Sequence, residues 1–218
     1  MGTLVDEALS LIARRSTPLS PVPVDLPERL RGYLNRPLPR PARALLFDIY
    51  GTLFISGSGE VGSAAGHRDD RHRSGRAHAV AEAFATATGT ELPDELACRA
   101  ADRYEAAIRE SHDRSRADGV PHPEVDIVAI WKQVLERIER TDRSAGGGGP
   151  VDLQRLALAY ELATNPVWPM PGARELLEGL ARTGRPLGIV SNAQFYTPLL
   201  FPALLGRSPV ELGLQIEL

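Results

Sequence analysis

The stretch Arg43-Ala-Leu-Leu-Phe-Asp48 decides the fold, because a short apolar run ends there in an acidic residue. A continuous apolar run of this length predicts a fully buried strand of a parallel sheet. Gly51 and Thr52 follow closely, and glycine allows the backbone to turn sharply. Ligands bind at the carboxyl ends of parallel strands, so Asp48 is a candidate nucleophile that could form a covalent ester.

A second apolar run, Leu187-Gly-Ile-Val190, ends in Ser191 and Asn192. The segment before it, residues 172–183, has apolar side chains at helical spacing, and Gly184 fits a C-terminal cap. This order of helix, glycine and strand is typical of an α/β crossover, and we expect a short buried strand here too. A serine hydroxyl and backbone amides at such a turn can hold a phosphate or carboxylate oxygen.

Between the two runs the pattern is mainly helical. The residues from Ile55 to about Arg76 are rich in glycine, serine, histidine and arginine, which predicts a loop. Apolar positions at helical spacing then predict four helices, over residues 77–88, 93–117, 124–140 and 151–164. Before the first run, residues 3–15 predict a short helix, and two proline clusters predict irregular backbone.

The composition is that of a globular protein, with 43% hydrophobic and 24% charged residues. A net charge of -3 gives no pull toward nucleic acid, and no apolar run reaches the roughly 18 residues that a membrane span needs. Cys98 is the only cysteine, so no disulfide can form within the chain. These features predict a cytoplasmic protein that binds neither nucleic acid nor membrane.

Either strand end alone also fits an ordinary turn, since strands often end in aspartate or serine. Together, the Asp48-Ile-Tyr-Gly-Thr52 turn, the helical insertion and the strand ending in Ser191 resemble the haloacid dehalogenase-like (HAD-like) hydrolase superfamily. The resemblance covers residues 43 to about 205 and implies an α/β fold. Its expected parts are an N-terminal extension (1–42), a Rossmann-like HAD core (43–54 and 166–218) and an inserted α-helical cap (55–165).

The resemblance also implies roles for individual residues. Asp48 would be the aspartate nucleophile and Ser191 a second catalytic residue. A small anionic substrate would be bound by Tyr50, Gly51, Thr52 and Asn192. In phosphatase-type members Asp48 and the backbone carbonyl of Tyr50 would also hold Mg²⁺, whereas dehalogenase-type members need no metal.

The chain departs from the family pattern in two places. Phosphatase members usually carry an aspartate at the position of Tyr50, where it protonates the leaving alcohol. The dehalogenase branch similarly has tyrosine there, and a halide needs no proton, so Tyr50 favours a haloacid over a phosphate ester. In addition, no lysine or aspartate follows Ser191, and Arg207 lies too close to it to match the family's third motif.

We therefore expect a core that stops before the family's third and fourth motifs, with a strand stub at residues 214–218. The strand expected beside residues 44–47 has no source, and an unpaired edge predicts aggregation or pairing with another chain, which leaves homo-oligomers open. Two functions follow. The chain is either a hydrolase acting on a small haloacid or phosphate ester, or a truncated or non-catalytic homologue that acts through binding.

Overall fold

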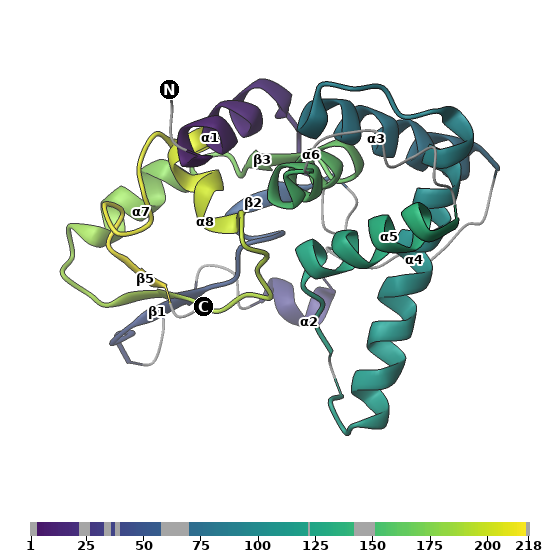
Figure 1. The fold of residues 1–218 in the computed structure, drawn as a ribbon. Coiled ribbons are helices and arrows are strands. Elements are labelled where there is room, and N and C mark those ends of the chain that lie inside the picture. The colour runs from purple at the N-terminus through teal and green to yellow at the C-terminus, as the bar shows by residue number, and fades with distance from the viewer. Residues whose placement is uncertain are drawn as a thin grey trace.

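The computed structural model describes residues 4–21, 27–32, 36–37, 40–57, 70–121, 123–141 and 151–216. The protein is a mixed α/β structure in which helices predominate beside a small parallel sheet (Figure 1). The first half of the described chain contains α1 (Leu4–Arg15), α2 (Glu28–Arg31), β1 (Leu45–Phe47), β2 (Phe54–Ser56), α3 (Asp70–Thr88) and α4 (Asp94–Ala117). The second half contains α5 (Ile127–Thr141), α6 (Leu153–Thr164), β3 (Val167–Pro169), α7 (Ala173–Ala181), β4 (Leu187–Ile189), α8 (Thr197–Leu200), the π-helical turn η2 (Phe201–Leu205) and β5 (Leu214–Ile216).

The parallel sheet has the strand order β1-β4-β5, so the predicted strand stub after residue 213 is confirmed over residues 214–216. β1 pairs with β4, and β4 pairs with β5, both in parallel. Within the described part of the chain β1 has β4 as its single neighbour and forms an edge of the sheet. The predicted gap beside β1 is therefore present in this structure.

The prediction that residues 44–47 form a fully buried strand is wrong, because Leu46 is 71% exposed. The register explains the difference. One face of the sheet carries the row Leu45, Leu187 and Leu214, of which the last two are buried. The opposite face carries Leu46, Gly188 and Gln215, which supply little apolar cover. The sheet is thus apolar on one face, and a continuous apolar run in the sequence does not reveal this.

The second predicted strand, over residues 187–190, is only partly buried. Leu187 and Ile189 are buried, but Val190, directly after β4, is 64% exposed. The helix before it is confirmed as α7, which begins after Gly172. Gly184 is confirmed at the C-terminal side of that helix, with φ +68° and its N–H donating to the Ala181 carbonyl at 3.2 Å.

The four helices α3 to α6 pack against one another and form what we call the helical body, on the right in Figure 1. They confirm the four predicted helices. The predicted loop from Ile55 to about Arg76 is wrong at both ends, since β2 covers residues 54–56 and α3 begins at Asp70; residues 58–69 lie outside the described part. Near the start of α3, Arg76 forms an ion pair of 2.8 Å with Glu105 of α4, a contact that periodicity does not show.

A two-stranded antiparallel connection joins the helical body to the sheet. β2 pairs with β3 so that Ile55 lies opposite Trp168. The Ser56 hydroxyl donates to the side-chain oxygen of Asn165 at 2.9 Å, and the Gly57 N–H donates to the Pro166 carbonyl at 2.8 Å. The chain therefore leaves for the helical body and returns from it at one point, which fixes where that body is attached.

The first helix is part of the folded unit. α1 lies against α6 of the helical body and against α8 and η2 beside the sheet (Figure 1). Its residues Leu11 and Ile12 are buried. Arg15 pairs with Glu82 of α3 at 2.9 Å. The helix thus bridges the helical body and the segment that follows β4.

Candidate functional site

The strand ends that carry Asp48 and Ser191 lie side by side. β1 and β4 are paired in parallel with Phe47 opposite Ile189, and the Val190 N–H donates to the Phe47 carbonyl at 2.9 Å. Asp48 and Ser191 therefore lie together at the carboxyl ends of the strands, which we call the sheet edge. Ligands bind at this end in parallel α/β sheets. Asp48 is exposed and Ser191 is partly buried.

Backbone hydrogen bonds hold the turn after Asp48. The N–H groups of Leu53 and Phe54 donate to the Ile49 carbonyl at 2.8 and 2.9 Å. Gly51 has φ +83°, a conformation that strains any residue with a side chain, and its N–H donates to the Phe54 carbonyl at 2.7 Å. Ile49, Leu53 and Phe54 are buried, so the turn is anchored from inside and holds Asp48 at a fixed point.

The remaining residues predicted to bind substrate flank this edge. Thr52 and Asn192 are exposed, one in each turn. The loop that begins at Ser191 also reaches the helical body, because the Gln194 side-chain amide donates to the carbonyl of Val125, just before α5, at 3.1 Å. The helical body therefore contacts the segment directly after the second predicted motif.

Tyr50 differs from its exposed neighbours, because its hydroxyl is enclosed. That hydroxyl shares a hydrogen bond of 3.0 Å with the hydroxyl of Thr197, a fully buried residue at the start of α8. Burial raises the pKa of Tyr50, and hydrogen bonds with Thr197 and Tyr196 oppose that rise. The phenol is therefore neutral at neutral pH and ties the first turn to the segment that follows Ser191.

Four of the chain's five tyrosines gather where the helical body meets this segment, and we call them, with Glu161, the tyrosine cluster. Its members are Tyr50, Tyr104, Tyr160, Tyr196 and Glu161. The Tyr104 hydroxyl donates to Glu161 at 3.1 Å, and the rings of Tyr104 and Tyr160 lie 4.8 Å apart. Tyr104 of α4 is thus joined to Glu161 and Tyr160 of α6, whereas Tyr50 and Tyr196 come from the segments that follow β1 and β4.

Burial dominates the electrostatics of this cluster. The pKa of Glu161 is raised by loss of water around its carboxylate, and hydrogen bonds from Tyr104 and Tyr196 partly offset that rise. Burial also raises the pKa of Tyr104 and Tyr196 well above the usual value. As a whole residue Glu161 keeps some exposed surface, so the enclosure concerns mainly its carboxylate.

Sequence reasoning missed Glu161, Tyr196 and Thr197. A signal for Glu161 was present, because it is the only charged residue between Arg155 and Arg174. A lone carboxylate in an apolar helix needs hydrogen-bond donors from elsewhere, which marks it as a residue with a specific partner. The partners themselves could not be read from the sequence, since they come from other elements.

Among the described residues no ion pair involves Asp48. The same residues contain no group of three or more histidine, cysteine, aspartate or glutamate side chains that could hold a metal ion. The predicted magnesium donors are Asp48 and the Tyr50 carbonyl. Magnesium usually takes one or two carboxylates together with substrate phosphate oxygens and water, so this small set fits it only beside a phosphorylated substrate.

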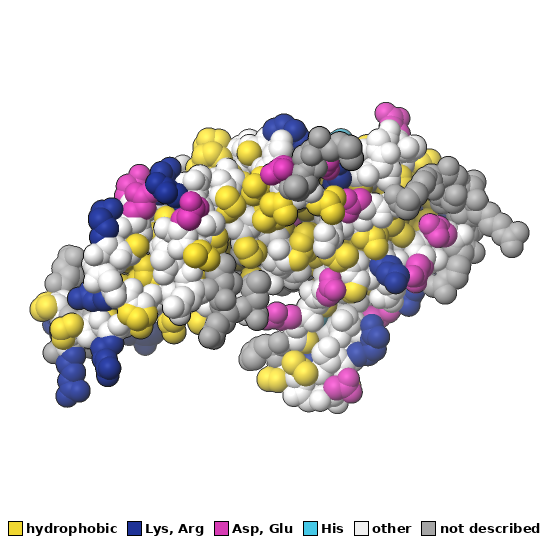
Figure 2. Space-filling view, turned by 60° about the vertical axis from the view of Figure 1, so that its left-hand side comes forward, with side chains coloured by type: hydrophobic (Ala, Val, Ile, Leu, Met, Phe, Trp, Pro, Cys, Tyr) yellow, Lys and Arg dark blue, Asp and Glu magenta, His cyan; other side chains and the backbone are white. Residues whose placement is uncertain are grey.

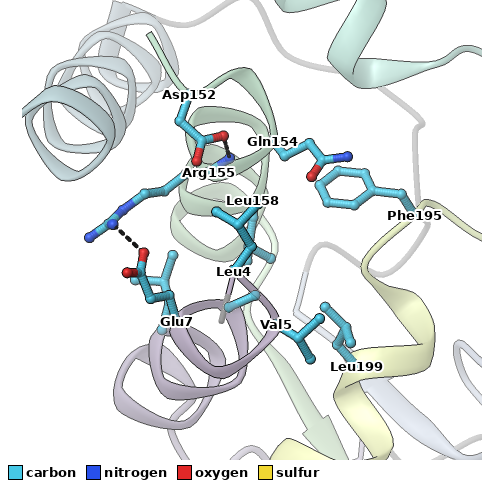
Figure 3. Close-up of a pocket in the computed structure, with 11 residues that line it drawn as sticks. Leu4, Val5, Glu7, Asp152, Gln154, Arg155, Leu158, Phe195 and Leu199 are labelled. Atoms are coloured by element: carbon cyan, nitrogen blue, oxygen red, sulfur yellow. Dashed lines mark hydrogen bonds and ion pairs between the residues drawn. The ribbon is translucent and has the colours of Figure 1, made fainter. Parts of the chain in front are cut away.

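A separate apolar hollow of about 100 Å³ lies between α1, α6 and the segment that contains Phe195 and the start of α8 (Figure 3). Leu4 and Val5 face Leu158 and Leu199 across it, and a 2.8 Å ion pair between Glu7 and Arg155 closes one side. Neither Asp48 nor Ser191 lines it. In the wider view, apolar side chains spread along the middle of one face among charges of both signs (Figure 2).

The chain has no match among protein-family models, curated proteins or solved structures. No helix within the described ranges is both long and apolar enough to cross a membrane.

Proposed function

We propose that the protein is a HAD-like hydrolase in which Asp48 forms a covalent ester with its substrate. The observation that carries the proposal is the pairing of β1 with β4, which brings the predicted nucleophile and Ser191 to the same sheet edge. The tight Gly51 turn and the helical body between the two strands support it. In this proposal the sheet is a partial Rossmann-like core and the helical body is its cap.

The preferred substrate class is a small haloacid. A carboxylate oxygen of Asp48 attacks the carbon that bears the halogen, a carbon–oxygen bond forms, and the halide leaves with the electron pair of the broken bond. Water then attacks the carboxyl carbon of the Asp48 ester. The ester breaks on its acyl side, and one proton of the water goes to the departing oxygen, which releases the hydroxy acid. The other proton passes to solvent, and Asp48 is regenerated as a carboxylate with one oxygen from water.

The environment of Tyr50 supports this preference. A phosphate ester releases an alkoxide that needs a proton, and a positioned acid typically contributes ~10²–10⁴-fold to that step. The Tyr50 hydroxyl is a poor acid, since burial raises its pKa and Thr197 already shares a hydrogen bond with it. A halide needs no proton, so this turn suits the cleavage of a carbon–halogen bond better than the cleavage of a phosphate ester.

Two of the groups that would bind the substrate lie on the turn after β4. The Ser191 hydroxyl and the Asn192 N–H would hold the carboxylate of a haloacid or the oxygens of a phosphate. If the substrate is a phosphate ester, Asp48 and the Tyr50 carbonyl would hold Mg²⁺, which would screen the phosphate charge. The helical body would exclude water and shape the choice of substrate.

A second function, binding without catalysis, is favoured by one specific observation. Asp48 has no cationic partner in the described part of the chain. Loss of one electrostatic element that stabilises the transition state typically costs ~10²–10³ in rate. A protein of this design would bind an anion or a partner at the sheet edge and turn over slowly or not at all.

Isotope labelling during turnover tests the proposal. The protein is incubated with short haloacids, or with phosphate esters with and without Mg²⁺, in water enriched in oxygen-18. Carbon attack followed by acyl cleavage places heavy oxygen in the Asp48 carboxylate, which peptide mass spectrometry detects. Attack at phosphorus leaves Asp48 unlabelled, because water then attacks the phosphorus atom.

Two variants complete the test. Asp48→Asn should abolish both product and label, since an amide is a poor nucleophile. Asp113→Asn is the matched control, because the Asp113 side chain is 79% exposed on α4 and should leave both unchanged. Absence of product and of any Asp48 adduct with every substrate would overturn the hydrolase proposal in favour of binding alone.

A further inference from the structure

β1 has one long side turned away from β4, which we call its open side; the strand runs along the lower left rim of the molecule in Figure 1. The Leu45 N–H donates to the Pro186 carbonyl at 3.0 Å, and the Phe47 carbonyl accepts from the Val190 N–H at 2.9 Å. In a strand the N–H and C=O of one residue point to the same side, and successive residues alternate. Both backbone groups of Leu46 therefore point to the open side, where the described part of the chain places no second strand.

The sheet face beside the open side is apolar and exposed. Leu46 is 71% exposed on it, and Val190, one strand further in, is 64% exposed. Proteins usually protect a strand of this kind with charged side chains or proline, or cover it with another segment. The residues of β1 are Leu45, Leu46 and Phe47, none of which is charged, so the open side is suited to accept another strand.

The charges that flank β1 favour an antiparallel copy of the same strand. Arg43 precedes β1 and Asp48 follows it, and both are exposed. When two copies pair with Leu46 opposite Leu46, Asp48 of one copy comes opposite Ala44 of the other, next to Arg43. A parallel pairing in the same register would place like charges together, which is unfavourable. The antiparallel pair is two-fold symmetric, so both copies contribute the same groups.

We propose that β1 pairs with β1 of a second copy of this chain, antiparallel about Leu46, and that Arg43 of each copy lies beside Asp48 of the other. The backbones of the two Leu46 residues would exchange N–H to C=O hydrogen bonds at the centre of one continuous sheet. Because the paired strands are short, we expect a weak dimer that depends on concentration.

The second copy would supply the cation that the described part of one chain does not pair with Asp48. This contribution to catalysis rests on the proposed hydrolase function. The pairing of the strands does not, so it is tested without a substrate.

Sedimentation of the full chain over a range of concentrations tests the pairing, and circular dichroism checks that each variant is folded. We expect wild type to pass from monomer to dimer as its concentration rises. Arg43→Glu should weaken the dimer by about tenfold, because attraction becomes repulsion at both ends of the paired strands. Adding Asp48→Arg to Arg43→Glu should restore the dimer, since the charges are then reversed together. Arg116→Glu is the matched control, because it makes the same change on an exposed residue of α4 in the helical body.

A crosslink tests the register. Cys98, the only cysteine, is first replaced by serine, and Leu46→Cys is then treated with a short bifunctional maleimide. Facing residues at the centre of such a pair have Cα atoms about 5.5 Å apart, so the two thiols should be joined across the dimer. Val190→Cys is the control, because Val190 is similarly exposed but follows β4, one strand away from the open side, and it should give little crosslinked dimer.

Mixed dimers test the contribution of Arg43 to the site. Arg43→Ala should lower turnover by about 10²-fold, and Asp48→Asn should have none. A mixture of the two variants should regain turnover, because Asp48 of the first chain then meets Arg43 of the second. If wild type is active and dimeric and mixing gives no gain, the role of Arg43 in the site is wrong.

A chain that stays monomeric at its highest soluble concentration overturns the proposal, since a second copy is then not what covers β1. A dimer that is unchanged in Arg43→Glu, or that crosslinks equally through Val190→Cys, overturns it as well, because the copies then meet at another surface. These measurements need no substrate, so failure of the oxygen-18 experiment would remove the hydrolase function and leave the pairing to be decided by sedimentation and crosslinking.

Discussion

Replacing Ile12 with alanine measures how far the fold depends on its first helix. Ile12 is 0% exposed, and α1 contacts α6, α8 and η2. The change removes three buried carbons, worth about 0.8 kcal/mol each, or about 2.4 kcal/mol in all. The cavity left behind adds to this, so we expect a loss of about 3 kcal/mol in the free energy of unfolding.

The measurement is urea unfolding followed by circular dichroism and by intrinsic fluorescence. The control is Val5→Ala, on the same helix but 51% exposed, which should change the free energy of unfolding by about 0.5 kcal/mol or less. Because α1 bridges the helical body and the segment after β4, both probes should report one transition that moves together in Ile12→Ala. A loss below about 0.5 kcal/mol for Ile12→Ala would show that α1 is an appended segment and that the reasoning is wrong.

Three further predictions concern the Gly51 turn, the edge strand β1 and the buried carboxylate of Glu161. Gly51→Ala should destabilise by about 1 kcal/mol because φ is +83°, whereas Gly75→Ala, in α3 with open space around it, should stabilise by about 0.5–1 kcal/mol; urea midpoints decide both. Leu46→Lys should leave stability within about 0.5 kcal/mol and reduce self-association in sedimentation, since Leu46 is exposed on an edge strand; unchanged association would contradict a role for that edge. For Glu161→Gln, the sign follows from a raised folded pKa: the contribution of Glu161 to stability is fully present below the ordinary value of 4.5 and is lost as pH rises through the raised value. Wild type should therefore lose stability relative to Glu161→Gln as the pH rises above 4.5, and a pH-independent difference would contradict this.

The sequence was sufficient to predict which segments form the sheet but not which face of it is covered. Short apolar runs at residues 44–47 and 187–190 became β1 and β4, and they are paired as expected for strands joined by a crossover. The burial of a strand residue depends on which residues lie beside it on the neighbouring strands. Only the alignment of Leu46 with Gly188 and Gln215 shows that one face lacks apolar cover.

The helix boundaries show a second limit. Apolar periodicity predicts α3 from residue 77, but the helix begins at Asp70, before the first apolar position of that pattern. Likewise, residues 3–15 were predicted as a helix, but their packing on α6 and η2 could not be, because the contacts join segments far apart in the chain. The local sequence pattern predicts the helices and strands. How they pack depends on contacts between residues that are far apart in the sequence.

The candidate site, too, could be predicted only in part from the sequence. The nearness of Asp48 and Ser191 follows from the pairing of β1 with β4, two strands that the sequence predicts. The link between Tyr50 and Thr197 depends on the placement of α8, a helix that begins after a loop with no periodic pattern. Glu161 was visible as an isolated charge, but the Tyr104 hydroxyl that donates to it comes from α4, far away in the sequence.

The contrast between Asp48 and Tyr50 bears on how such a site would work. Within three consecutive residues the carboxylate is exposed, Ile49 is buried and the tyrosine hydroxyl is enclosed. A substrate would therefore meet Asp48 from the open side of the sheet edge. For the Tyr50 hydroxyl to touch the same substrate, it would have to release Thr197, leaving a fully buried hydroxyl without that partner at a cost of roughly 1–3 kcal/mol. Tyr50 is thus better suited to hold the turn in place than to contact the substrate through its hydroxyl, and Tyr50→Phe should affect the geometry of the turn more than the affinity for an anion.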